Sequence, residues 1–207
     1  MNDLKAVVFD YGGVLVEYQQ AAELRRLESL SGLDSKGFHA AYWEFRLAYD
    51  RGDLDGPAYW AEIARVTGRT YPAETLKALV EVDSQSWTHL NERMVRWVRK
   101  LQAAGITTAI ISNLSIELRT WLEGMDWVRA CRQRTYSCDI RVAKPDAPIY
   151  RHCLEGLGLR PEQTLFLDDK MPNVEGARAV GMNALLFTSA DNLAPQAATM
   201  GLPRLDP

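Results

Sequence analysis

The stretch AVVFDYGG, residues 6–13, decides the fold class of this chain of 207 residues. It continues an apolar run that begins at Leu4, and a short apolar run that ends at turn-forming residues predicts a buried β-strand. Asp10 comes directly after the run, and Gly12 and Gly13 then break it. We therefore expect a carboxylate at the carboxyl end of the first strand.

Further apolar runs repeat this pattern along the chain. The other predicted strands are 106–111, 164–167 and 184–187, with a shorter one at 135–138. The helices predicted between them are 91–104, 115–122, 146–157 and 173–180. Strands that alternate with helices predict parallel β-α units. The expected fold class is therefore α/β, a doubly wound parallel sheet with right-handed crossovers.

The region from Glu17 to Thr88 interrupts this alternation, because it contains helical patterns and no strand run. The helices predicted there are 21–30, 38–49, 57–66 and 72–87. We expect two domains: a core built from residues 1–16 and 89–207, and an α-helical domain, residues 17–88, inserted after the first strand.

The composition argues against several classes of protein. Lysine and arginine number 24 against 27 aspartates and glutamates, a net charge of −3 without a large basic cluster, which disfavours a nucleic-acid surface. No apolar run approaches the roughly 20 residues that span a bilayer, and the N-terminus lacks a signal-peptide pattern. We expect a cytoplasmic protein with no membrane or nucleic-acid partner, and self-association stays open.

Polar side chains stand where the predicted strands end. They are Asp10, Ser112, Asn113, Asp168 and Asp169, and Lys144 stands at the start of a predicted helix. Ligands of parallel sheets bind beyond the carboxyl ends of the strands, so these groups are expected to meet. Carboxylates hold Mg²⁺ through oxygen, an ammonium and a hydroxyl orient a phosphoryl group, and an aspartate can act as its nucleophile.

Four segments carry a resemblance to a known family. They are FDYGGVL (9–15), ISN (111–113), AKPDAPIY (143–150) and FLDDKMPNVEGARAVGM (166–182). In their order and spacing they resemble the signature motifs of the haloacid dehalogenase-like hydrolase superfamily. The inserted helices resemble a cap domain of that family over its Rossmann-like core. The branch most similar to these motifs contains bacterial sugar-1-phosphate phosphatases and the phosphatase domain of soluble epoxide hydrolase.

The resemblance implies a role for each matching residue. Asp10 would be the nucleophile and a Mg²⁺ ligand, and Gly12 would offer its main-chain carbonyl to the metal. Ser112 and the backbone of Asn113 would hold the phosphoryl oxygens. Lys144 would connect Asp10 to the phosphoryl charge. Asp169 would be the main acidic metal ligand of the last motif, with Asp168 beside it. In the helical domain, substrate contacts would come from among Tyr42, Arg46, Tyr49 and Arg51.

One position departs from the family pattern. Phosphatases of this superfamily usually carry a second aspartate two residues after the nucleophile, as acid and base, and here Gly12 stands there. The leading hypothesis is a Mg²⁺-dependent phosphatase of a small phosphorylated metabolite, with sugar phosphates as one candidate class, acting through an aspartyl phosphate on Asp10.

Three alternatives stay open. A metal-free 2-haloacid dehalogenase needs no acid, because halide leaves without a proton. The last motif of that branch contains serines, however, where Asp168 and Asp169 stand in this chain. Phosphonate cleavage through a lysine Schiff base would need a matching lysine in the helical insert, which contains only Lys36 and Lys77. The third alternative is a catalytically weak phosphate-binding module.

Overall fold

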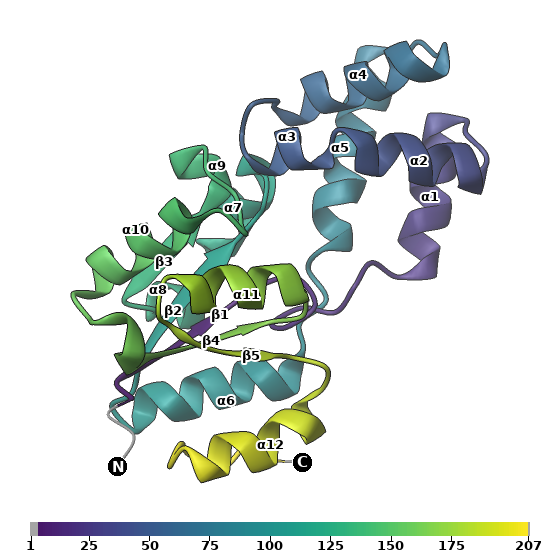
Figure 1. The fold of residues 1–207 in the computed structure, drawn as a ribbon. Helices are drawn as coiled ribbons and strands as arrows, with labels where there is room; N and C mark the ends of the chain where they lie inside the picture. The colour runs from purple at the N-terminus through teal and green to yellow at the C-terminus, as the bar shows by residue number, and fades with distance from the viewer. Residues whose placement is uncertain (1–3, 207) are drawn as a thin grey trace.

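The computed structural model describes residues 4–206 and contains one parallel sheet of five strands in the order β3-β2-β1-β4-β5 (Figure 1). The strands are β1 (Ala6–Phe9), β2 (Thr107–Ser112), β3 (Gln133–Tyr136), β4 (Thr164–Asp168) and β5 (Asn183–Leu186). In register, Phe9 pairs with Ile110 of β2 and Leu167 of β4. The predicted fold class is confirmed, and β1 lies at the centre of the sheet.

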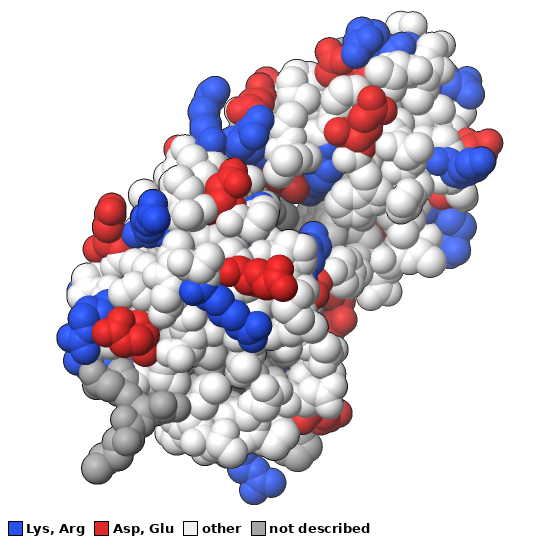
Figure 2. All heavy atoms as spheres, viewed as in Figure 1, with Lys and Arg blue, Asp and Glu red and all other residues white. Residues whose placement is uncertain are grey.

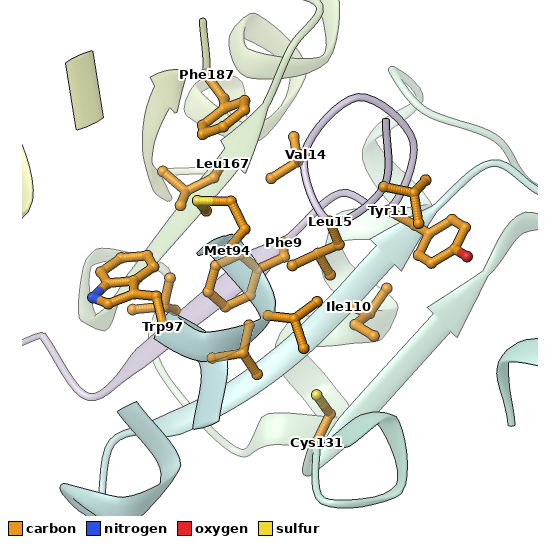
Figure 3. Packing of buried hydrophobic residues seen from close by; sticks show 14 of the residues in the cluster. Phe9, Tyr11, Val14, Leu15, Met94, Trp97, Ile110, Cys131, Leu167 and Phe187 are labelled. Atoms are coloured by element: carbon orange, nitrogen blue, oxygen red, sulfur yellow. The ribbon is translucent and has the colours of Figure 1, made fainter. Parts of the chain in front are cut away.

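Helices cover both faces of the sheet. One face packs on α6 (Glu92–Ala103), α7 (Ile116–Leu122), α8 (Asp126–Arg129) and α12 (Ala190–Thr199), and the other on α10 (Ala147–Leu157) and α11 (Met171–Ala179). Alternate residues of β1 serve the two layers: Val7 and Phe9 belong to the first hydrophobic cluster and Ala6 and Val8 to the second. Figure 3 shows Phe9 packed near Trp97 and Leu167 in the first cluster.

Two predicted elements differ from the observed ones, and two observed helices were not predicted. The short strand expected at 135–138 is β3, two residues earlier, and the chain turns at Tyr136 into the helix α9 (Ser137–Ile140). The helix expected at 38–49 breaks at Phe45 (φ −103°, ψ 0°) into two. Helices α8 and α12 were not expected, because α8 spans one turn and α12 contains Pro195, which weakens a helical pattern.

Five helices form what we call the helical lobe. They are α1 (Ala21–Ser31), α2 (Ser35–Glu44), α3 (Arg46–Asp50), α4 (Gly56–Thr67) and α5 (Ala73–Ser86). Its hydrophobic cluster draws on these helices and their connections and contains no residue of the sheet. In Figure 1 the lobe projects from the sheet beyond the carboxyl ends of the strands.

Two adjacent chain segments join the lobe to the rest of the protein. The amide of Glu17 donates to the carbonyl of His89 at 2.8 Å, and the amide of Asn91 donates to the carbonyl of Leu15 at 2.9 Å. A second contact lies beyond them, where the amide of Gly56 donates to a carboxylate oxygen of Glu117 at 2.7 Å. These bonds hold the lobe over the strand ends.

The charges on the surface have no dominant sign. Acidic and basic side chains are interspersed on the face shown in Figure 2. Over the described residues 4–206, no helix has the length and apolar character that a membrane crossing requires.

Candidate active site

Asp10 lies at the end of β1, where the main chain leaves the sheet. Its Oδ1 accepts from the amide of Tyr11 at 2.6 Å and from the Ser112 hydroxyl at 2.9 Å, and it lies 2.7 Å from Nζ of Lys144. The residue is 6% exposed, and it borders a cavity. Because these three contacts converge on Oδ1, Oδ2 is the oxygen left for a reacting group.

Lys144 is held from two directions. Its Nζ lies 2.7 Å from oxygens of both Asp10 and Asp168 and donates to the carbonyl of Ile111 at 3.2 Å. Its main chain is bracketed by the Asn113 amide group, which accepts from the Lys144 amide at 2.8 Å and donates to its carbonyl at 3.0 Å. The Asn113 side chain therefore positions Lys144, a contact that the sequence did not reveal.

Both carboxylate oxygens of Asp168 accept hydrogen bonds from neighbouring groups of the protein. Besides Lys144, its oxygens accept from the Asn173 side-chain amide at 3.0 and 3.1 Å and from the Lys170 main-chain amide at 2.8 Å. The residue is fully buried. Asn173 lies inside the first turn of α11, so this helix orients Asp168, and Asp168 in turn orients Lys144.

Asp169 points elsewhere, as strand alternation predicts. Its Oδ2 accepts from the Tyr18 hydroxyl, which comes from the segment leading into the helical lobe. Its Oδ1 is buried and has no hydrogen-bond partner among the described residues. Asp10, Asp168 and Asp169 each offer an oxygen, and these oxygens lie within 4.8 Å of one another. An unpartnered buried oxygen in a cluster of three carboxylates fits a cation ligand.

The ionisation of the site follows from burial and from Lys144. Burial raises the pKa of Asp10 to about 7, against the lowering effect of the Lys144 charge. Burial also opposes ionisation of Asp168, but Lys144 and the donors around it hold the pKa of Asp168 below its ordinary value. Burial would lower the pKa of Lys144, yet the two carboxylates raise it overall. Lys144 is therefore an ammonium at neutral pH.

Gly12 and Gly13 have different steric surroundings. A Cβ at Gly12 would approach only the Trp87 ring, at the ordinary distance of 3.7 Å. Gly13 has φ +74°, and a Cβ there would lie 2.5 Å from Oδ2 of Asp169. The loop needs glycine at position 13, because a side chain would push Asp169 away, whereas position 12 has room for one.

The helical lobe supplies the opposite wall of a cavity of about 240 Å³ over Asp10. Lining residues from the lobe are Trp43, Arg46, Leu47 and Asp50, and those from the sheet side include Ser112, Asn113, Lys144 and Lys170. Of the lobe residues suggested by sequence, Arg46 reaches this cavity. Arg51 pairs with Asp53 instead. Lys170 and Asp50 also border the site. Lys170 lies within the fourth motif but was not assigned a role, and no motif indicated Asp50, because only the packing of the lobe brings it there.

The Arg46 guanidinium has two carboxylate partners. Its Nε donates to Asp50 at 2.9 Å and its Nη1 lies 3.1 Å from both oxygens of Asp83. Burial raises the pKa of Asp50 to about 6, although the Arg46 charge opposes this. Carboxylates of the lobe therefore balance the charge of Arg46. The other cations that line the cavity are Lys144, which pairs with Asp10 and Asp168, and Lys170.

The chain is similar to several known hydrolases in sequence or fold. The chain is 26% identical over 187 residues to the sesquiterpene phosphatase astK of Aspergillus oryzae, covering 90% of this chain and 91% of that protein. It is 25% identical over 204 residues to (S)-2-haloacid dehalogenase 4A of Burkholderia cepacia, covering 93% and 86%. Among solved structures, the HAD family enzyme bt-2542 of Bacteroides thetaiotaomicron superposes with a TM-score of 0.73 at 17% identity, covering 88% and 93%.

A family model extends over most of the described chain. The model of the haloacid dehalogenase-like hydrolases matches residues 4–181, a range that includes the first three motifs, the fourth up to Gly181, and the helical lobe. The chain therefore belongs to the haloacid dehalogenase-like hydrolase family.

Proposed function

We propose that this hydrolase is a Mg²⁺-dependent phosphatase of a small phosphorylated metabolite. The observation that carries the proposal is the unpartnered buried Oδ1 of Asp169 beside Asp10 and Asp168. Three carboxylates against one ammonium leave the site negative, and a phosphate dianion would be repelled unless a cation were added. The likeness to a chain named as a sesquiterpene phosphatase supports the same hypothesis.

The residues at the site fit a magnesium ion. We assign Asp10, Asp169 and the main-chain carbonyl of Gly12 as its principal ligands. Asp168 completes the acidic cluster, and its bonds to Lys144 and Asn173 make orientation its main role. When bound, the ion neutralises charge that develops on the phosphoryl oxygens.

The side chains of the protein would then act in sequence. Oδ2 of Asp10 attacks phosphorus, the bond to the leaving oxygen breaks, and an aspartyl phosphate forms. Ser112 and the main chain of Asn113 bind the phosphoryl oxygens, and Lys144 balances their charge. Water then attacks phosphorus and releases inorganic phosphate and the free carboxylate of Asp10. Gly12 provides no acid for the leaving oxygen, so substrates with stabilised leaving groups are favoured.

We further propose that residues 17–88 serve as the cap of this site and residues 1–16 and 89–207 as its catalytic core. The four motifs all lie outside 17–88. The lobe lines the cavity over Asp10 through Trp43 and Leu47, which suits selection of the substrate and exclusion of water.

The test is hydrolysis of an aryl phosphate with Mg²⁺ by the wild type and by Asp10→Asn. We expect turnover by the wild type, none by the variant, and unchanged far-UV circular dichroism. Substantial hydrolysis by a pure preparation of Asp10→Asn would refute the role of Asp10 as nucleophile.

The dehalogenase alternative is tested with the same two proteins. The likeness to (S)-2-haloacid dehalogenase 4A makes it the second candidate. Chloride release from 2-chloropropionate in excess chelator, without hydrolysis of any phosphate monoester, would replace the phosphatase proposal. We expect the opposite result, because Asp168 and Asp169 create a negative site that repels a carboxylate substrate.

A further inference from the structure

The cavity over Asp10 has two chemically different sides. The sheet side supplies carboxylates, amides and ammonium groups, whereas the lobe and its connection supply large apolar side chains together with the Arg46–Asp50 ion pair. Tyr18, Trp43 and Leu47 all line this cavity, and they are 54%, 43% and 52% exposed. Exposed apolar side chains that gather at one place mark a binding site, because scattered single ones are the ordinary case.

A second cavity of about 350 Å³ adjoins the first, and we call it the apolar chamber. Its aromatic and aliphatic lining is Tyr18, Leu24, Phe38, Tyr42, Trp43 and Trp87. Three of these residues, Tyr18, Trp43 and Trp87, line both cavities, so the two spaces are neighbours on either side of these rings. Figure 2 shows the surface hollowed where the helical lobe meets the rest of the molecule.

The charges of the two cavities set the orientation of a substrate. Lys144, Lys170 and Arg46 line the first cavity, whereas among the described residues no lysine or arginine lines the apolar chamber, which instead contains Glu28. With the proposed Mg²⁺ at the carboxylates, a phosphate group would therefore bind over Asp10, and Glu28 would repel it from the chamber. The polar groups of the chamber are few beside its six aromatic and aliphatic side chains: Gln19, whose amide already bonds Tyr42 and Ser86, and Glu28, Ser35 and His39. A polyhydroxylated leaving group would lose its hydrogen bonds with water there.

We infer that the substrate is an amphiphilic phosphate monoester, whose phosphate lies over Asp10 and whose apolar tail lies in the apolar chamber against Trp43. This inference rests on the proposed phosphatase function and names its substrate class. A tail in this chamber gains free energy with every buried methylene, and the size of the chamber falls in the range of small-molecule sites, about 300–1,000 Å³.

The experiment separates binding from catalysis. Butyl-, hexyl- and octylphosphonate, which cannot be hydrolysed, are titrated calorimetrically into the protein with Mg²⁺, below their micellar concentrations. The matching alkyl phosphates and an aryl phosphate are assayed for hydrolysis. Trp43→Ala removes the shared ring, and Trp121→Ala is the matched control, because Trp121 is 40% exposed and lines neither cavity.

We expect octylphosphonate to bind about tenfold or more tightly than butylphosphonate, since each buried methylene contributes up to about fourfold. Trp43→Ala should reduce this ratio to about threefold or less, and Trp121→Ala should leave it unchanged. Equal binding of the two phosphonates would overturn the inference, as would a ratio that Trp43→Ala does not alter. Because butanol and octanol are equally poor leaving groups, kcat/KM is compared within the alkyl series, and a kcat/KM that does not rise from butyl to octyl phosphate would also overturn it.

The experiment gives different results when the phosphatase proposal is wrong and when the inference of an amphiphilic substrate is wrong. If aryl phosphate is hydrolysed but chain length has no effect on binding, the phosphatase stands and the amphiphilic substrate is wrong. If no monoester is hydrolysed while the chain-length dependence persists, the apolar chamber stands and the phosphatase is wrong.

Discussion

Nζ of Lys144 lies 2.7 Å from Oδ2 of Asp168, and both side chains are almost completely removed from solvent. The same ammonium lies 2.7 Å from Asp10, so one buried cation serves two carboxylates that come from different strands. This arrangement makes Lys144 important for stability as well as for the proposed catalysis.

Lys144→Met should therefore lower both activity and stability. Removing one partner of a buried ion pair destabilises a protein by about 3–5 kcal/mol, because the remaining charge is left unpaired. Urea unfolding would measure this loss. Adding Asp168→Asn should restore part of the stability without restoring turnover, since one of the two unpaired carboxylates is then neutral. A double variant as unstable as Lys144→Met would contradict the shared-cation arrangement.

Mg²⁺ should raise the melting temperature of the protein, and chelator should abolish both this shift and phosphatase activity. A ligand at about 100 times its Kd stabilises a fold by about 2.7 kcal/mol. Asp169→Asn should remove most of the shift, because it weakens the carboxylate with the unpartnered Oδ1. Asp191→Asn, on the exposed start of α12, is the control and should respond like the wild type. A full Mg²⁺ shift in Asp169→Asn would exclude Asp169 as a ligand.

Gly12→Asp should increase turnover most for alkyl phosphates, whose leaving groups need a proton. The upper bound for a positioned acid is about 10²–10⁴ in rate, and aryl phosphates should gain less. The structure permits the substitution, since a Cβ at Gly12 meets only the Trp87 ring at 3.7 Å. The variant must keep its thermal stability and Mg²⁺ affinity. Equal responses of alkyl and aryl phosphates would mean that another group already supplies the proton.

Asp50 should make the protein less stable as the pH rises from about 4 to 6. Burial raises its pKa from 3.8 to about 6, so the folded state holds the proton more tightly than the unfolded chain. The favourable contribution is therefore complete below the unfolded pKa and is lost as pH rises through the folded pKa. A shift of this size corresponds to roughly 3 kcal/mol at most.

Asp50→Asn removes this titration. Urea unfolding is measured at pH 4 and pH 7. The free energy of unfolding of the variant, relative to that of the wild type, should be higher at pH 7 than at pH 4. The variant lacks the contact with Arg46 at both pH values, so this loss does not affect the change in the stability difference between them. An identical difference at the two values would show that Asp50 titrates normally.

Much of the site could be predicted from sequence. Asp10, Ser112 and Asp168 each follow or end a short apolar run, and such runs form buried parallel strands whose carboxyl ends meet at one edge. The expected α/β fold and its family are confirmed on this basis. The helix break at Phe45 and the earlier start of β3 were not predictable. Local hydrophobic periodicity carries no information on how the ends of helices and strands pack against distant elements.

What the sequence by itself determined is the order of the strands and of most helices, the family, and the set of polar residues at the strand ends, because these follow from local hydrophobic pattern and motif spacing. Only the tertiary structure decided that Lys144 is shared by Asp10 and Asp168, that Tyr18 bonds Asp169, and that Asp50 borders the cavity. Each of these contacts joins residues far apart in the chain. Their distances depend on the docking of the helical lobe and on the packing of α11, which no local pattern encodes.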